Sequence, residues 1–491
     1  MSSPPTSVAS GHRSLGWTLA LLALAQLIFS LDLNIVFVAL PEIGADLGFS
    51  GQTLQWVVGA YAVFAGGFLL FGGRAADLFG RRRVFVIALT LYALSSLAGG
   101  LATNPEMIIV ARAVQGIGGA LLLPSTLSLI NTLFEEGPRR NKALAVWGGA
   151  GASGLTVGAL LGGLLTEGFG WPAVFYVNVP LAAIVALAAL YFIPRDERRT
   201  ESRKFDFPGA LTVTVGATLL VYVLVQGPED GWSSPGIIIS AVLAVALLIA
   251  FAVIEARSSD PLMPLRLFNN RSLVVGISVT FIYMGTFGAL PYFLTTLFQG
   301  VHRFSALETG LAFLVPSLAI ATGTQLGGRI ATRLGVRPTL WIGFGIGIVG
   351  TAALAIGFDV ESSYLVAVPG LIVSGVGQGL VWTAMFIAAS SGVAPEEQGV
   401  ANGMATTTLN LGYAIGLAIL IAIANAGVGG LSGEEARIAS ADGGFIAVLL
   451  AAAGMLLGLL ITLVHPKASE PSTPRDGLKT GESEPATARV P

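Results

Sequence analysis

Fourteen apolar runs, each about 20 residues long, limit the possible folds of this chain more than any other feature. A helix of that length crosses the hydrocarbon core of a bilayer. Charged residues make up only 11% of the chain, too few to cover a water-facing surface, so an ordinary soluble enzyme is excluded. We predict an all-α integral membrane protein with spans near residues 15–40, 54–72, 84–102, 107–133, 143–166, 173–193, 208–226, 236–255, 272–298, 309–327, 338–357, 365–391, 400–424 and 444–465.

The basic residues predict the orientation of these spans. If both termini lie on the cytoplasmic side, 23 of the 26 Lys and Arg residues lie on that side as well. Only Arg303 and Arg437 lie on the other side, and Arg112 lies within a span. Basic loops stay in the cytoplasm during membrane insertion. We therefore expect cytoplasmic termini and a multi-pass protein of the cytoplasmic (inner) membrane.

An internal repeat divides the chain. Gly73–Arg82 follows the second span, and the similar Gly328–Arg337 follows the tenth span, 255 residues later and on the same side. Parallel repeats of this kind are typical of transporters with two six-helix halves. The two central spans are left over and read as an inserted hairpin. The expected domains are a disordered tail at 1–14, a six-helix half at 15–193, a linker with two extra helices at 194–271, a second six-helix half at 272–465 and a disordered tail at 466–491.

Two charged residues within the spans are candidates for proton coupling. Asp32 is the only acid well inside a span, where a carboxylate is costly unless it faces a wet cavity or a partner. It either carries a proton and contacts a cationic substrate, or is a hydrogen-bonded structural residue. Arg112 is the only base in a span and keeps its charge. It either tunes a nearby carboxylate or binds backbone carbonyls, or it extends outward to the membrane surface.

The basic loop after the second span is a candidate gate. Positive-inside anchoring explains its arginines, Arg81 among them, but not Asp77 between Gly73 and Gly80. An acid near the start of the next helix favours the dipole of that helix and can pair with a nearby arginine. An ion pair made and broken at the inner mouth would act as a gate; simple anchoring is the alternative.

Two further sets of residues are candidates for packing and for substrate contact. Gly154, Gly158 and Gly162 share one face of the fifth span and permit close helix contact, either for packing alone or also for a rocking movement. The residues that could line a substrate cavity are Asn34, Tyr292, Gln299 and Trp382. Aromatic residues at the membrane surface more often form interfacial belts.

These motifs together resemble the major facilitator superfamily, and within it the fourteen-span drug:proton antiporters. Leu31–Pro41 is similar to the first-helix signature of that family, and Gly73–Arg83 to the superfamily loop motif. The resemblance covers residues 15–465 and extends to Arg112 with Gln115 and Gly116 in the fourth-helix motif for proton transfer, to Trp171, Phe175, Asn178 and Pro180, and to Pro261–Arg271.

The sequence also departs from the family pattern. Asn34 replaces a threonine and Phe37 an asparagine of the first-helix signature, which affects what the cavity binds. Ala159 stands where the antiporter motif has proline after Gly158, and this leaves the direction of coupling open.

The resemblance implies a proton-coupled secondary transporter that exports hydrophobic, cationic or neutral small molecules such as drugs. The alternative is an exporter of one endogenous metabolite, lipid or antibiotic, by symport or uniport. An intramembrane enzyme or sensor is a remote alternative, because the interiors of the spans hold no acid pair and no histidine. We expect a monomer in the lipid bilayer that acts on a small-molecule substrate and protons, with no cofactor, no metal and no nucleic acid. The chain has no cysteine, and its three histidines are far apart in the sequence.

Overall fold

The computed structural model describes residues 8–135, 138–196, 206–258, 261, 265–393, 398–428 and 431–464. Helices and turns make up this part of the chain, and none of its residues is in a strand. The N-terminal half contains α1 (Val8–Leu47), α2 (Trp56–Phe79), α3 (Arg81–Gly100), α4 (Pro105–Leu133), α5 (Pro138–Phe169), α6 (Pro172–Tyr176) and α7 (Asn178–Phe192). The inserted hairpin is α8 (Phe207–Asp230) and α9 (Pro235–Arg257).

The C-terminal half follows the hairpin. Its helices are α10 (Arg271–Thr286), α11 (Leu290–Thr295), α12 (Ala306–Ala312), α13 (Leu314–Leu334), α14 (Val336–Ala355), α15 (Tyr364–Ser390), α16 (Gln398–Ala424) and α17 (Gly433–Thr462). Short turns of other helix types complete the fold. These are η1 (Thr53–Gln55) before α2 in the N-terminal half, and η2 (Leu265–Asn269), η3 (Phe287–Ala289), η4 (Thr296–Val301) and η5 (Ile356–Phe358) around the C-terminal helices.

The helix lengths confirm an all-α membrane fold. Within the described ranges, 13 helices are long and apolar enough to cross a bilayer. The remaining predicted span, 54–72, coincides with η1 and most of α2. The apolar helical stretch there, Thr53–Leu69, is shorter than the other 13. The count of fourteen and the side of the termini therefore stay predictions, as do the domain boundaries.

Helix boundaries differ from the apolar runs where polar residues extend or interrupt a helix. The sixth run is divided into α6 and α7 at Val177. The tenth is divided at Phe313, and α12 begins earlier than the run because Ser305 and Glu308 form a capping box. α17 starts at Gly433, where acidic residues of the first turn hide the helix from a hydropathy pattern. α1 begins at Val8, within the predicted N-terminal tail, and residues 465–491 lie outside the described part of the chain.

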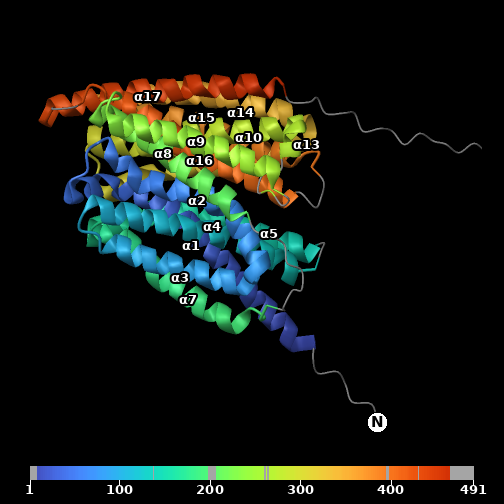
Figure 1. Cartoon of the computed structure of the whole chain (residues 1–491). Coiled ribbons are helices and arrows are strands. Elements are labelled where there is room, and N and C mark those ends of the chain that lie inside the picture. The colour runs from blue at the N-terminus through green and yellow to red at the C-terminus, as the bar shows by residue number, and fades with distance from the viewer. Residues whose placement is uncertain are drawn as a thin grey trace, which may run out of the picture.

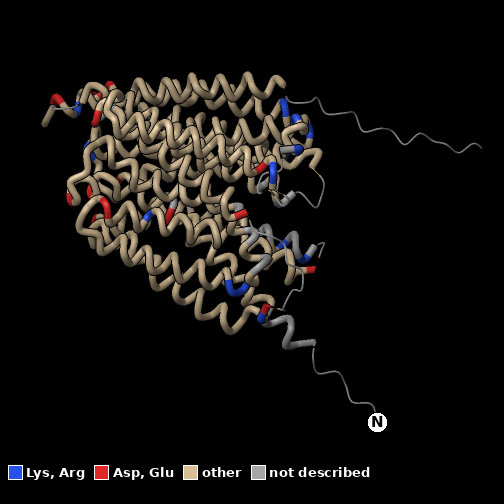
Figure 2. Tube along the Cα trace, viewed as in Figure 1, with Lys and Arg blue, Asp and Glu red and all other residues tan. Residues whose placement is uncertain are grey.

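Most charged residues lie near the two ends of the helix bundle, with basic residues prominent at one end and acidic residues at the other (Figure 2). One end, here called the basic end, is where α1 begins and α17 ends (Figure 1), and it holds Arg81–Arg83 at the start of α3 and Arg329 near the end of α13. The other, the acidic end, carries Glu167 in the last turn of α5, Glu308 in the first turn of α12 and Glu434 in the first turn of α17. This division places the basic loops on the side that the positive-inside rule assigns to the cytoplasm.

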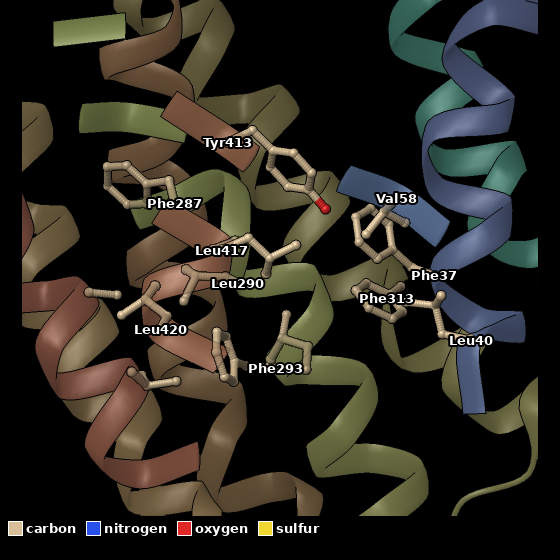
Figure 3. Packing of buried hydrophobic residues seen from close by; sticks show 14 of the residues in the cluster. Phe37, Leu40, Val58, Phe287, Leu290, Phe293, Phe313, Tyr413, Leu417 and Leu420 are labelled. Carbon is tan, nitrogen blue, oxygen red and sulfur yellow. The ribbon is translucent and has the colours of Figure 1, made fainter. Parts of the chain in front are cut away.

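The two halves meet toward the acidic end and diverge toward the basic end (Figure 1). A large buried apolar cluster contains residues of both halves, with Phe37, Leu40 and Val58 on one side and Phe313 and Tyr413 on the other (Figure 3). Polar contacts join the halves as well. Gln299 Nε2 donates to the carbonyl of Val38 at 2.8 Å, and Thr407 Oγ1 donates to the carbonyl of Gly66 at 3.1 Å.

The hairpin packs on both halves through α8. A separate buried cluster joins this helix to α2 and α16 and consists of Trp56, Ala60, Val63, Ala217, Val221, Val225, Ala414 and Ala418. A Cβ at Gly67 of α2 would lie 2.2 Å from the hydroxyl of Thr214, so the two helices are in direct contact. In contrast, α9 exposes large apolar side chains such as Ile239 and Val242, as a lipid-facing helix does.

Candidate functional site

Asp32 lies in the middle of α1 and is completely buried. A carboxylate in such a place needs partners, because burying an unpaired charge is strongly unfavourable. Its Oδ2 accepts a hydrogen bond from Arg112 Nη1 of α4 at 2.6 Å, and this contact is also an ion pair. Two helices, α4 and α7, supply side-chain donors to this one carboxylate.

Arg112 is 1% exposed and is held in place from several directions. Its Nε donates to the carbonyl of Val57 on α2 at 2.7 Å, and its Nη1 also donates to Gln115 Oε1 at 2.7 Å. The guanidinium lies over the ring of Tyr61, 4.5 Å from the ring centre, in a cation–π contact. The side chain therefore points into the N-terminal half and not outward to the membrane surface, and it both pairs with a carboxylate and binds a carbonyl.

Two amides complete the set of donors around Asp32, and the sequence predicted a contact with Asp32 for neither. Gln115 Nε2 donates to Asp32 Oδ1 at 2.9 Å and to Ser96 Oγ of α3 at 2.9 Å. Asn178 Nδ2, at the start of α7, donates to the same Oδ1 at 3.0 Å. Both residues belong to motifs by which the sequence resembles its family, and an amide within an apolar helix is the signal that could have identified them. The network connects α1, α2, α3, α4 and α7.

The loop between α2 and α3 is organised by an acid that the sequence did not indicate. The carboxylate of Asp196 accepts hydrogen bonds from the backbone N–H groups of Arg82 and Arg83, at 3.0 and 3.1 Å. It thus binds free donors at the start of α3, the position predicted for Asp77. Gly80 has φ +96°, and a Cβ there would lie 2.4 Å from Asp196, so glycine is required.

For the other residues of the predicted gate, the structure gives fewer contacts. The surroundings of Gly73 and the side chain of Asp77 lie outside the described part of the structure, so the predicted Asp77 ion pair stays a prediction. Arg81 Nη1 donates to Thr132 Oγ1 of α4 at 2.5 Å. In the repeat, Arg329 and Arg333 line a hollow of about 430 Å³ at the basic end of α13, together with Gln325, Gly328 and Thr332.

The three glycines of α5 lie directly against the backbone of α1. A Cβ on Gly154, Gly158 or Gly162 would lie 2.6, 2.5 or 2.7 Å from the carbonyl oxygen of Leu27, Leu31 or Ile35, respectively. No side chain fits at such a distance, so glycine allows the two helices to touch. Because both helices belong to the N-terminal half, these three contacts lie within it, next to Asp32.

The four predicted cavity residues are not brought together in one site. Tyr292 donates to the carbonyl of Gly51 at 3.4 Å and, like Gln299, bridges the two halves at the acidic end. Trp382 of α15 is 37% exposed and packs against Tyr283, with ring centres 5.6 Å apart. Asn34 lies on α1 close to Asp32 in sequence and is partly buried. None of the four lines the hollow on α13.

The described residues contain no group of three or more His, Asp and Glu that could hold a metal ion. The buried polar network consists of five side chains: one acid, one base, two amides and one hydroxyl. Such a set can bind a proton or a cation at the carboxylate, and it contains no nucleophile–base pair for bond cleavage.

Known proteins with similar sequences are named as antibiotic resistance or export proteins. The family model described as Major Facilitator Superfamily matches residues 22–417. The chain is 38% identical to a puromycin resistance protein of Streptomyces alboniger, with 90% of this chain and 89% of the relative covered. It is 36% identical to a cephamycin export protein of Amycolatopsis lactamdurans, with 91% and 93% covered. A lincomycin resistance protein of Streptomyces lincolnensis is 34% identical, with 84% and 85% covered.

Solved structures support the same fold at low sequence identity. The nucleoside transporter NupG superposes with a TM-score of 0.66 at 14% identity, covering 92% of this chain and 100% of that protein. A bacterial homologue of the human lysosomal transporter Spinster, in an inward-facing conformation, superposes with a TM-score of 0.65 at 17% identity, covering 92% and 96%. The chain is thus a multi-pass membrane transporter and not an enzyme, and it belongs to the major facilitator superfamily.

Proposed function

We propose that this protein exports hydrophobic, cationic or neutral small molecules, antibiotics among them, in exchange for protons. The basic end faces the cytoplasm in this proposal, and the two halves rock to expose a central site to each side in turn. The observation that carries it is the buried Asp32–Arg112 network inside a chain that is 38% identical to a puromycin resistance protein. The loop Gly73–Arg83, with Gly80 and Arg81, is proposed as part of the inner gate.

Proton coupling is proposed for Asp32 because its charge state decides which contacts it can make. As a carboxylate it accepts hydrogen bonds from Arg112, Gln115 and Asn178. Once protonated it loses the ion pair and has to donate a hydrogen bond of its own. Arg112 stays charged in either case, so release of the pair frees a positive group that the half must accommodate. A proton on Asp32 thus changes the packing of α1 against α4.

The function is tested in proteoliposomes with an imposed pH gradient. Asp32→Asn keeps the shape of the side chain and its hydrogen bonding, but this side chain cannot lose a proton. We expect the variant to insert normally, to lose uphill transport and to bind a cationic substrate more weakly. If it concentrates substrate at the wild-type rate, Asp32 is structural and the proton-carrier role is wrong.

A second candidate function is export of one particular antibiotic or metabolite by the same fold. The relatives named after puromycin, cephamycin and lincomycin favour it, because each name refers to a single compound. An efflux panel in a pump-deficient host separates the two, using these three antibiotics with ethidium and tetraphenylphosphonium. Resistance to several unrelated compounds supports multidrug export, whereas resistance to one supports the narrow exporter.

A further inference from the structure

The two halves touch backbone to backbone at the acidic end, where α5 meets α12. A Cβ on Gly163 of α5 would lie 2.5 Å from the carbonyl oxygen of Ala306. A Cβ on Gly310 of α12 would lie 2.7 Å from the carbonyl oxygen of Ala159. Glycine on each side therefore allows two helices from different halves to approach as closely as neighbours within one half. Opening this end of the molecule requires that the contact separate.

A carboxylate crosses the interface at this contact. Glu167, in the last turn of α5, accepts a hydrogen bond from the backbone N–H of Leu307 at 3.0 Å. It comes from the N-terminal half, whereas Leu307 lies in the first turn of α12 in the C-terminal half. Hydrogen bonds to a charged acceptor are stronger than those between neutral groups.

The start of α12 shows why this donor is open to a partner from the other half. Ser305 and Glu308 form a capping box, in which Ser305 Oγ accepts from Glu308 N at 3.2 Å and Glu308 Oε2 accepts from Ser305 N at 2.8 Å. These two bonds remain within the C-terminal half. The N–H of Leu307 is a further first-turn donor that a helix cannot satisfy from its own backbone, and Glu167 accepts from it.

We propose that Glu167 is a latch that holds the acidic end closed while the halves are apart at the basic end. Each time the transporter opens at the acidic end, the bond from Leu307 to Glu167 has to break. Glu167 is therefore a positioning residue for transport, which acts on the balance between the two conformations and not on substrate. The inference rests on the proposed alternation of the two halves, and its first test measures conformation and not transport, so that a failure of the latch can be told from a failure of the proposed function.

The natural chain contains no cysteine, so a single introduced cysteine reports opening without background. Leu40 is 2% exposed and lies close to Phe313 of the C-terminal half in the apolar cluster shared by the two halves (Figure 3). In intact cells, a membrane-impermeant maleimide reacts with Leu40→Cys only when the acidic end is open. We expect Glu167→Ala to raise the labelling rate about fivefold, and Glu167→Gln about threefold, because the amide oxygen still accepts a hydrogen bond but carries no charge.

Glu308→Gln is the matched control. It makes the same substitution on the same surface, and glutamine also forms a capping box, so the labelling rate stays at the wild-type value. Wild-type labelling in Glu167→Ala overturns the latch, as does an equal increase in Glu308→Gln. Loss of efflux in every variant with the expected labelling rates means that the proposed function fails and the latch stands.

A reversible cross-link tests the same inference without weakening the fold. In the double variant Glu167→Cys with Leu307→Cys, a disulfide ties α5 to α12. We expect the oxidised protein to stop transporting and the reduced protein to recover at least half of the rate that the double variant shows before oxidation. Transport at an unchanged rate with the disulfide intact contradicts the proposal, since the contact then does not need to open.

Discussion

At the scale of single residues, the buried ion pair decides how the N-terminal half tolerates change. A buried pair contributes little net stability, because desolvation of both charges offsets their attraction. Removing one member is different, since it leaves the other charge buried without a partner. Asp32 is 0% exposed and Arg112 1% exposed, so neither can reach water without movement of a helix.

We predict that Arg112→Gln alone lowers the free energy of unfolding by about 3–5 kcal/mol, because it leaves the carboxylate of Asp32 unpaired. The double variant Arg112→Gln with Asp32→Asn should recover most of this loss, since two neutral amides can hydrogen-bond to each other. Thermal unfolding of the purified protein in detergent compares the two variants with the wild type. A double variant as unstable as Arg112→Gln would show that the lost contacts to Val57 and Tyr61 matter more than the charge.

The sequence identified both charged residues of this site but not their arrangement. A charge within an apolar run is visible in one dimension, so Asp32 and Arg112 could each be singled out. Their pairing depends on the packing of α1 against α4. The contacts of Asn178 and Asp196 were not predicted for the same reason. Each residue binds a helix that is far from it in sequence, and the residue type alone does not indicate the partner.

At the scale of helices, α5 has two glycine faces with different partners. Gly154, Gly158 and Gly162 lie against α1 within one half, whereas Gly163 lies against α12 of the other half. The sequence predicted the first contact surface from four-residue spacing. It could not separate Gly163 from its neighbour, because the assignment of a helix face to a partner requires the positions of both halves.

We predict that Gly158→Ala destabilises the protein by about 1–3 kcal/mol, because the new Cβ would lie 2.5 Å from the carbonyl oxygen of Leu31 and the backbone has to shift. Gly149→Ala on the same helix is the control. No heavy atom lies within 4 Å of a Cβ there, and alanine is the better helix former by about 1 kcal/mol. Thermal unfolding should therefore separate the two variants in opposite directions, and equal melting temperatures would argue against close packing of α1 and α5.

At the scale of the whole molecule, the sequence predicts the architecture better than it predicts where any one helix begins and ends. The alternation of basic and non-basic loops is the pattern that predicts the architecture. The repeat at Gly73 and Gly328 predicts two similar halves. The superposition of the chain on a solved transporter agrees with a transporter fold. The breaks at Val177 and Phe313 were not predicted, because an apolar run stays apolar across a turn.

Topology is tested by reporter fusions on the two sides of α8. A reporter placed after Arg199 should lie in the cytoplasm, and one placed after Asp230 should lie outside, because α8 crosses the membrane between them. Phosphatase activity, which appears only outside, and fluorescence of a cytoplasmic reporter give complementary signals. Two cytoplasmic results would remove the hairpin from the membrane and reduce the number of spans to twelve.

The position of α8 makes the two flanks of the interface between the halves unequal. On one flank, α8 occupies the groove between α2 and α16, which acyl chains fill in a transporter without such an insertion. In the proposed rocking movement, this groove changes its width against a helix of the same chain and not against fluid lipid. On that flank, the free-energy cost of changing the groove width then depends on the side chains of α8. On the other flank, bilayer thickness and lipid composition contribute to the cost.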